Sequence, residues 1–169
     1  MSLLDTLPEA SVLELASKNE VWDVAGAKVA FGSVFAQQKT VVVFIRHFFC
    51  GICQLYVEQL AAVPEAALES AGTKIVIVGC GEWKAIQNYV GQAKRSYITM
   101  GSWSNAWQSL KTGPFKDPSL IGKQGNFTQL GGDFVLGPGN QCNFAHRMQH
   151  TEDHVEVADL MKTAAVTLP

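Results

Sequence analysis

Two runs of consecutive apolar, β-favouring residues stand out in the first half of the chain, at residues 41–45 and 75–78. Neither run alternates between polar and apolar side chains, which is typical of strands covered on both faces. Between them, residues 51–72 carry apolar side chains at helical spacing, and Pro64 is expected to kink the helix or restart it. The pattern predicts a β-α-β unit with parallel strands.

Shorter elements flank this unit on the N-terminal side. Residues 8–16 predict a short leading helix with Asp5 or Thr6 as its N-cap. Residues 21–31 alternate around a glycine-containing turn and predict a small hairpin at an edge.

The second half begins with two helix candidates, residues 82–94 and 104–111, followed by a glycine- and proline-rich loop over residues 112–132. A loop of this length in a compact domain is usually functional or mobile. Residues 133–136 and 142–145 then flank Gly-Pro-Gly-Asn, a strong hairpin signal. We expect Thr151 to cap a closing helix that runs to about Thr163.

This element order predicts an α/β, thioredoxin-like fold: a mixed central sheet with helices on both faces. A length of 169 residues fits one domain over residues 1–169, with residues 1–20 as an N-terminal helical extension.

Composition narrows the function classes. The chain is 47% hydrophobic and 17% charged with a net charge of -2, and no basic run alternates with aromatic residues, which argues against nucleic-acid and anionic-membrane partners. No apolar run is long enough to span a membrane, and the first residues lack the basic and apolar regions of a signal peptide. The expected compartment is therefore the cytoplasm.

Cys50 and Cys53 form a C-x-x-C pair where the first buried strand runs into the crossover helix. A helix N-terminus and a nearby cation lower a cysteine pKa from about 8.5 to roughly 3.5–7.5. Arg46, and His47 when protonated, can supply that positive charge. The spacing predicts a redox pair in which Cys50 attacks an oxidised substrate and Cys53 resolves the product. With a peroxide the intermediate is a sulfenic acid, and with a disulfide it is a mixed disulfide.

The same cysteines also allow structural interpretations that compete with the redox interpretation. Cys50 and Cys53 are alternatively buried small hydrophobes or half of a zinc site, but no second C-x-x-C supplies the remaining ligands. Three histidines recur at intervals of four and would share one helical face only if their whole segment were helical, so we expect surface histidines beside a helix start and no metal: His146, His150 and His154.

The two remaining cysteines carry weaker signals. Cys80 follows the second buried strand and so lies near the same sheet edge as Cys50. We favour a buried cysteine at a tight turn over a spare partner or regulatory thiol. Cys142, in a predicted hairpin strand, receives no role.

Over about residues 21–160 the chain resembles the peroxiredoxin-like branch of the alkyl-hydroperoxide-reductase/thiol-specific-antioxidant (AhpC/TSA) family. The resemblance rests on a combination of motifs: Arg46-His47-Phe48 before Cys50-x-x-Cys53, Gly79-Cys80-Gly81, Gly131-Gly132-Asp133-Phe134-Val135, and Phe144-Ala145-His146-Arg147 before Thr151-x-Asp153-His154. It implies a thioredoxin fold, a thiol-based antioxidant or oxidoreductase role in the cytosol, and a homodimer.

The family's peroxidatic motif, P-x-x-x-T-x-x-C, is absent in both registers. With Cys50 as its cysteine, Val43 and His47 occupy the proline and threonine positions. With Cys53 instead, Arg46 and Cys50 occupy them, which would make Cys53 the peroxide-reactive sulfur. Thioredoxins, in contrast, attack with the first cysteine. The sequence leaves the attacking sulfur open.

We therefore predict a thiol-dependent oxidoreductase that reduces peroxides without a cofactor, using an external thiol donor such as the thioredoxin or glutathione system. The expected catalytic residues are Cys50, Cys53 and Arg46, with Cys80 and Arg147 as additional candidates. The alternatives are a protein disulfide reductase, or a non-catalytic module that binds a protein partner through the long loop and the apolar Phe48-Phe49 pair.

Overall fold

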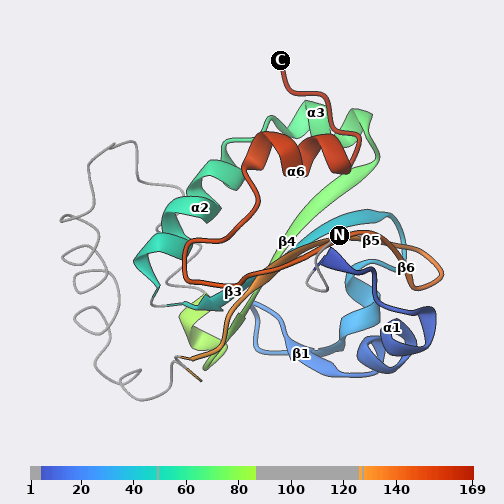
Figure 1. The fold of residues 1–169 in the computed structure, drawn as a ribbon. Coiled ribbons are helices and arrows are strands. Elements are labelled where there is room, and N and C mark those ends of the chain that lie inside the picture. Colours follow the sequence, from blue (N-terminus) through green and yellow to red (C-terminus); the bar gives the residue numbers. More distant parts are fainter. Residues whose placement is uncertain (1–4, 49, 87–125, 127) are drawn as a thin grey trace.

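The computed structural model describes residues 5–48, 50–86, 126 and 128–169 of the chain and is organised around a four-stranded mixed sheet (Figure 1). The strands run in the order β4-β3-β5-β6. Their bounds are β3 (Lys39–His47), β4 (Thr73–Cys80), β5 (Gly132–Gly137) and β6 (Gln141–Arg147). β3 pairs with β4 in parallel, whereas β5 is antiparallel to both β3 and β6.

The crossover between β3 and β4 consists of two helices, α2 (Gly51–Ala61) and α3 (Glu65–Ser70). Pro64 is the N-cap of α3, where its missing N–H leaves no hydrogen bond unmade. The restart predicted at this proline is therefore confirmed, as is the parallel β-α-β unit.

The predicted hairpin at the C-terminal side of the sheet is also confirmed. β5 and β6 pair from Gly132–Arg147 to Gly137–Gln141. The turn between them places Gly139 and Asn140 at φ values of 76° and 55°, in the left-handed region that these two residue types tolerate best.

Alternate residues of β3 enter two separate cores on opposite faces of the sheet, as the two-residue period of a strand requires. On one face, Val41, Val43 and Ile45 pack with α2 and with α6 (Val157–Thr163). On the other, Val42 packs with α1 (Ala10–Ser17) and with the 3-10 helix η2 (Phe31–Val34). Figure 1 shows α2, α3 and α6 on one side of the sheet and α1 on the other, so the expected placement of helices on both faces is confirmed.

Two predicted helix starts are wrong. The N-cap of α1 is Glu9, without a side-chain hydrogen bond, rather than Asp5 or Thr6. α6 begins at Val157 and not after Thr151. Local capping preference is overridden by tertiary hydrogen bonds here, since Asp5 binds His146 and the Val155 N–H donates to the Asp133 carboxylate.

Two predictions about strands also need correction. The hairpin of β1 (Glu20–Trp22) and β2 (Lys28–Ala30) forms a two-stranded sheet of its own rather than an edge of the central sheet. Residues 74–80 of β4 are only half-buried, because β4 ends the row of strands among the described residues.

Several predictions fall outside the described residues. Of the helix expected over residues 82–94, the structure describes the helical turn at residues 84–86, and the helix over 104–111 is not described at all. Most of the loop over 112–132 also lies outside them. Within the described part of the chain, no helix has the length and apolar character needed to cross a membrane.

Candidate functional site

Cys50 is the N-cap residue of α2, between the end of β3 and the first helical turn. Its backbone is extended, and its sulfur accepts the Cys53 backbone N–H at 3.4 Å, as a serine or aspartate oxygen does at other N-caps. The sulfur therefore faces the unpaired N–H groups and the partial positive charge at the start of the helix, where a thiolate is favoured.

The two cysteines differ in protonation. A hydrogen bond from the Cys53 thiol, the Cys53 N–H and the Arg46 guanidinium together lower the pKa of Cys50 to about 6, although burial opposes them. The Cys53 pKa moves strongly upward, because its thiol donates to Cys50 and its side chain is fully buried. These shifts favour the thiolate at Cys50 and the thiol at Cys53 near neutral pH. Both are free cysteines in this structure.

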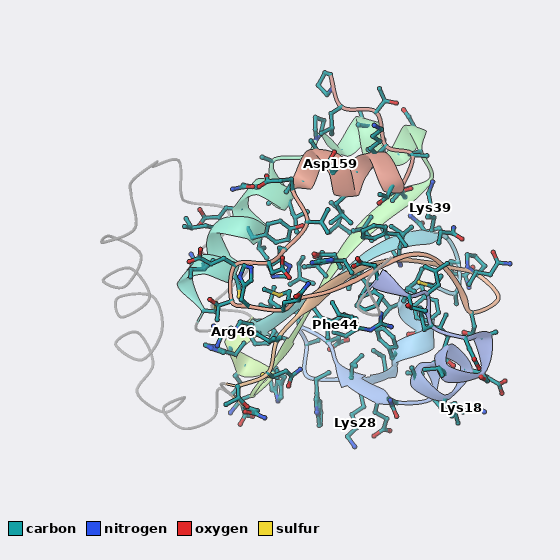
Figure 2. All side chains as sticks on the ribbon, viewed as in Figure 1. Lys18, Lys28, Lys39, Phe44, Arg46 and Asp159 are labelled. Atoms are coloured by element: carbon teal, nitrogen blue, oxygen red, sulfur yellow. The ribbon has the colours of Figure 1, made fainter. Side chains whose placement is uncertain are left out.

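Arg46 brings positive charge to this pair from the end of β3, where α2 begins (Figure 2). One of its terminal nitrogens, Nη1, lies 4.0 Å from the Cys50 sulfur. Its Nε donates to the Gln129 carbonyl at 3.4 Å, which links the site to the segment before β5. Arg46 therefore contacts both the Cys50 sulfur and the segment before β5.

His47 does not contribute the charge that the sequence allowed for it. The side chain is buried, and burial together with the positive charge of Arg46 lowers its pKa. The lowered pKa favours the neutral imidazole, so among the described residues Arg46 supplies the positive charge beside Cys50.

Close packing keeps the neighbouring backbone in position. A Cβ built on Gly131 would lie 1.9 Å from the Phe44 carbonyl oxygen, and one on Gly79 would lie 2.7 Å from the Phe48 ring. Both positions need glycine because another chain segment occupies the space of a side chain. Phe48 in turn packs against the core that contains Cys50 and Cys53.

The structure places the two additional candidates, Cys80 and Arg147, in different surroundings. Cys80 is the last residue of β4 and pairs in register with His47, and its thiol donates to the Arg46 carbonyl at 2.7 Å. Cys80 is half-buried, next to the backbone of the site. Arg147 lies on β6, where its guanidinium donates to the Thr6 carbonyl at 2.9 Å and lies over the Phe134 ring.

The predicted surface histidines do not form one group. His146 lies on β6, and His150 is exposed in the following turn. His154 is different, because only 4% of its side chain is exposed, so the expectation of three surface histidines is wrong for it. The described residues contain no cluster of three or more His, Cys, Asp or Glu side chains that could hold a metal ion.

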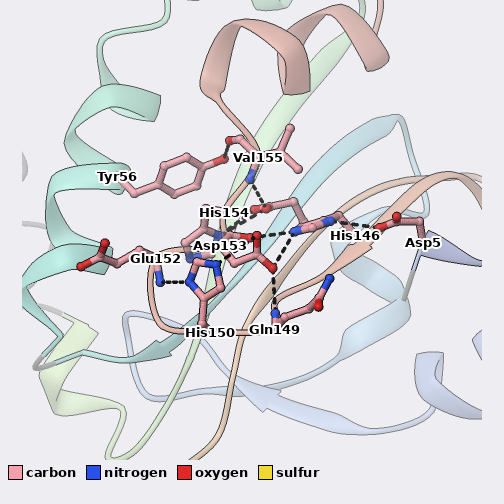
Figure 3. Close-up of polar contacts among 10 residues, drawn as sticks. Asp5, Tyr56, His146, Gln149, His150, Glu152, Asp153, His154 and Val155 are labelled. Atoms are coloured by element: carbon pink, nitrogen blue, oxygen red, sulfur yellow. Dashed lines mark hydrogen bonds and ion pairs between the residues drawn. The ribbon is translucent and has the colours of Figure 1, made fainter. Parts of the chain in front are cut away.

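Sequence reasoning missed a buried polar group beside α2, of which Figure 3 shows the His154 ring next to Tyr56. Asp133 is fully buried and binds Nδ1 of His154 at 3.0 Å, and the His154 ring stacks on Tyr56 with ring centres 4.3 Å apart. The available signal was an aspartate inside an otherwise apolar strand, since a carboxylate at such a position needs a buried partner.

Comparisons with known proteins show which family the chain is similar to. A family model described as AhpC/TSA antioxidant enzyme matches residues 90–150. Peroxiredoxin-like 2C from Homo sapiens is 30% identical over 191 aligned positions that cover 93% of this chain and 80% of that protein. Peroxiredoxin-like 2C from Mus musculus is 29% identical with the same coverage.

Among solved structures, the chain is similar to a thiol:disulfide interchange protein of the thioredoxin family from Chlorobium tepidum TLS. The TM-score is 0.50 at 15% identity, and the match covers 89% of this chain and 92% of the other. At this level of identity the likeness concerns the fold alone, and it confirms the predicted thioredoxin-like architecture.

Proposed function

The chain belongs to the peroxiredoxin-like AhpC/TSA family of the thioredoxin superfamily, and from this membership we propose that it is a thiol-dependent oxidoreductase that reduces peroxides. Cys50 is the attacking sulfur, Cys53 the resolving sulfur, and Arg46 the cation that stabilises negative charge at the site. An external thiol donor, the thioredoxin or glutathione system of the cytoplasm, completes the cycle.

The state of Cys50 is the observation that carries this proposal. Peroxides react with the thiolate and not with the thiol, and a pKa of about 6 makes Cys50 mostly thiolate at neutral pH. The raised pKa of Cys53 favours Cys50 as the attacking sulfur. Thioredoxins likewise attack with the first cysteine of the pair. Cys50 is 7% exposed and Cys53 is 0% exposed, which favours the same order.

The proposed reaction has two covalent steps. The Cys50 thiolate attacks one peroxide oxygen, the O–O bond breaks, and the leaving oxygen takes a proton to give water or an alcohol. The Cys53 sulfur then attacks the Cys50 sulfenic acid, which forms the Cys50–Cys53 disulfide and releases water. Two electrons and two protons from the external thiols return the site to its dithiol form. The Arg46 guanidinium, next to the Cys50 sulfur, is suited to stabilise the leaving oxygen.

Stopped-flow fluorescence of the reduced protein mixed with hydrogen peroxide tests the proposal. The native protein should react much faster than free cysteine and end as an intramolecular disulfide, identified by mass spectrometry. Cys50→Ser should abolish the reaction, whereas Cys53→Ser should still react and stop at a sulfenic acid that dimedone traps. Cys142→Ser is the matched control, because burial raises the pKa of Cys142 and its thiol donates to the Phe144 carbonyl. A native rate no higher than that of free cysteine rejects the peroxidase.

Disulfide reduction is the second candidate, because the Cys50 thiolate and its thiol partner are equally suited to attack a disulfide bond. Insulin reduction driven by a thioredoxin-reductase system measures this activity directly. A protein that reduces insulin and not peroxides would be a disulfide reductase. A protein that does neither, yet binds a partner unchanged in the Cys50→Ser, Cys53→Ser double variant, would be a non-catalytic module.

A further inference from the structure

The parallel pairing of β3 with β4 is irregular just before the cysteine pair. Between Phe44 and His47 the register shifts by one residue. Two residues of β3, Ile45 and Arg46, therefore stand opposite Gly79 alone. This is a β-bulge, which is rare between parallel strands and typical of places where a strand redirects a side chain beside an active site.

The bulge explains how Arg46 reaches the Cys50 sulfur. Residues of a regular strand alternate between its two faces, so Arg46 would follow Phe44 onto the face that α1 covers. Cys50, in contrast, belongs to the core on the α2 face, and Arg46 Nη1 lies 4.0 Å from its sulfur. The extra residue breaks the alternation between Phe44 and Arg46, at the end of β3 (Figure 2), and lets the guanidinium reach the α2 side.

The Cys80 thiol holds this bulge from the neighbouring strand. It donates to the Arg46 carbonyl at 2.7 Å, where the bulge disturbs the regular backbone ladder. The backbone around Cys80 is restricted on both sides. The Phe48 ring occupies the place of a side chain at Gly79, and Gly81 has a φ of 120°, which favours glycine. The donor and its acceptor are therefore both fixed in position.

The side-chain contacts of Arg46 make its backbone position important. The guanidinium lies 4.0 Å from the Cys50 sulfur through Nη1, and 3.4 Å from the Gln129 carbonyl through Nε. The second distance is longer than the usual 2.7–3.2 Å of an N–H···O hydrogen bond. A small shift of the Arg46 backbone would weaken both contacts, so a hydrogen bond that fixes this backbone also fixes the charge beside Cys50.

We propose that Cys80 is a positioning residue for Arg46: its thiol holds the bulge in the form that keeps the guanidinium beside the Cys50 sulfur. The inference rests on the thiol chemistry proposed above, in which Cys50 attacks and Arg46 stabilises negative charge. Cys80 acts through Arg46 and undergoes no covalent step. The contacts that connect Cys80 to Cys50 pass through this one residue, from its carbonyl to its guanidinium.

Two other roles of Cys80 must be separated from this one. A half-buried thiol also fills space, whatever hydrogen bond it makes. His47, the register partner of Cys80, has a pKa lowered by burial and by Arg46, so a change at Cys80 would also act through that imidazole. The Cys80 sulfur lies 3.9 Å from the Asn126 carbonyl, which makes the Arg46 carbonyl the nearer acceptor.

Alkylation of Cys50 by iodoacetamide tests the proposal without any peroxide. The rate follows the thiolate fraction, and tandem mass spectrometry locates the adduct on Cys50. Serine at position 80 keeps a donor on the same Cβ, whereas alanine removes it. We expect the native protein and Cys80→Ser to share a midpoint near pH 6. The midpoint of Cys80→Ala should lie higher by about 0.3–0.5 pH unit, no more than that of Arg46→Met.

A double-variant cycle shows whether the effect passes through Arg46. In an Arg46→Met background, Cys80→Ala and Cys80→Ser should have midpoints within about 0.1 pH unit of each other. Cys142 supplies the matched control, because its thiol also donates to a backbone carbonyl, that of Phe144 on β6, at 3.1 Å. Cys142→Ala and Cys142→Ser should share one Cys50 midpoint, even where the alanine variant is less stable.

The outcomes that overturn the proposal are specific. Equal midpoints in Cys80→Ala and Cys80→Ser would show that the hydrogen bond has no effect on Cys50. A difference that persists in the Arg46→Met background would assign the effect to His47 or to packing. An unchanged midpoint in Arg46→Met itself would remove the charge that Cys80 is said to position. Failure of the peroxidase leaves this test intact, since iodoacetamide reports on the Cys50 thiolate alone.

Discussion

The Cys53 backbone N–H donates to the Cys50 sulfur across 3.4 Å, so Cys53 holds the Cys50 sulfur in place before any disulfide exists. The Cys53 thiol also donates a hydrogen bond to the Cys50 sulfur, and this hydrogen bond is the largest cause of the low Cys50 pKa. In the proposed cycle, Cys53 thus has two successive roles: it first stabilises the Cys50 thiolate and afterwards attacks the oxidised sulfur. The hydrogen bond that the Cys53 thiol donates to Cys50, together with burial, raises the pKa of Cys53 itself.

Replacing Cys53 by alanine should raise the pKa of Cys50, because the variant loses the thiol donor and keeps only the backbone N–H. Titration of thiolate absorbance should give a midpoint near pH 6 for the native protein. We expect the midpoint of Cys53→Ala to lie higher by about one pH unit or more. Cys142→Ala should leave the midpoint unchanged. An unchanged midpoint in Cys53→Ala would show that the helix start and Arg46 alone set the Cys50 pKa.

Replacing Arg46 by methionine should also raise the pKa of Cys50, but by less than Cys53→Ala does. The reason is that the guanidinium contributes less to the low Cys50 pKa than the Cys53 hydrogen bond does. We expect the rate with hydrogen peroxide at pH 7 to fall by about 3–10-fold, with part of the loss recovered at higher pH. Arg147→Met is the matched control, because that guanidinium binds Thr6 and lies over Phe134. Equal losses in the two variants would contradict the assignment of Arg46 to the site.

The parts of the fold that the sequence predicted correctly are those with a local cause. The apolar run in β3, the restart at Pro64 and the Gly139-Asn140 turn each follow from residues adjacent in the chain. The start of α6 was missed because its cause is remote: Asp133 binds the Val155 N–H and the His154 ring from across the fold. No pattern within residues 151–156 reveals that partner.

In the candidate site, too, the sequence predicted the features with a local cause and missed those that depend on tertiary contacts. The C-x-x-C spacing and the strand-to-helix position predicted a thiolate, but not which sulfur carries it, because that depends on which sulfur caps the helix and which is buried. His47 was expected to add charge when protonated. Its burial beside Arg46, which keeps it neutral, is a tertiary property that residue type alone does not indicate.

His146 should make the stability of the fold depend on pH. Burial disfavours its charged form, but hydrogen bonds to the Asp153 carbonyl and Asp5, with nearby carboxylates, raise its pKa overall above 6.5. Its stabilising contribution is therefore complete below pH 6.5 and is lost as pH rises through the folded-state pKa. Urea denaturation across this range should show that His146→Gln destabilises by about 1 kcal/mol or less at low pH, and by progressively less at higher pH.

The control for this titration is His150→Gln, whose imidazole is exposed and lies 3.8 Å from Asp153. It should change stability little at any pH. A destabilisation by His146→Gln that grows as pH rises would mean that the imidazole is favoured in its neutral form, and would contradict the role of Asp5 and Asp153 as its charge partners.

Gly131 and Gly137 offer a matched test of close packing before and at the end of β5. An alanine Cβ at 131 would lie 1.9 Å from the Phe44 carbonyl oxygen, whereas one at 137 meets no atom within 4 Å. Both substitutions restrict the unfolded chain equally, so the difference between them isolates the folded state. Urea denaturation should show that Gly131→Ala lowers the free energy of unfolding by about 2 kcal/mol or more, and Gly137→Ala changes it by about 0.5 kcal/mol or less. Equal effects would mean that the segment before β5 can move away from β3, and such movement would also carry Gln129, the hydrogen-bond partner of Arg46, out of the site.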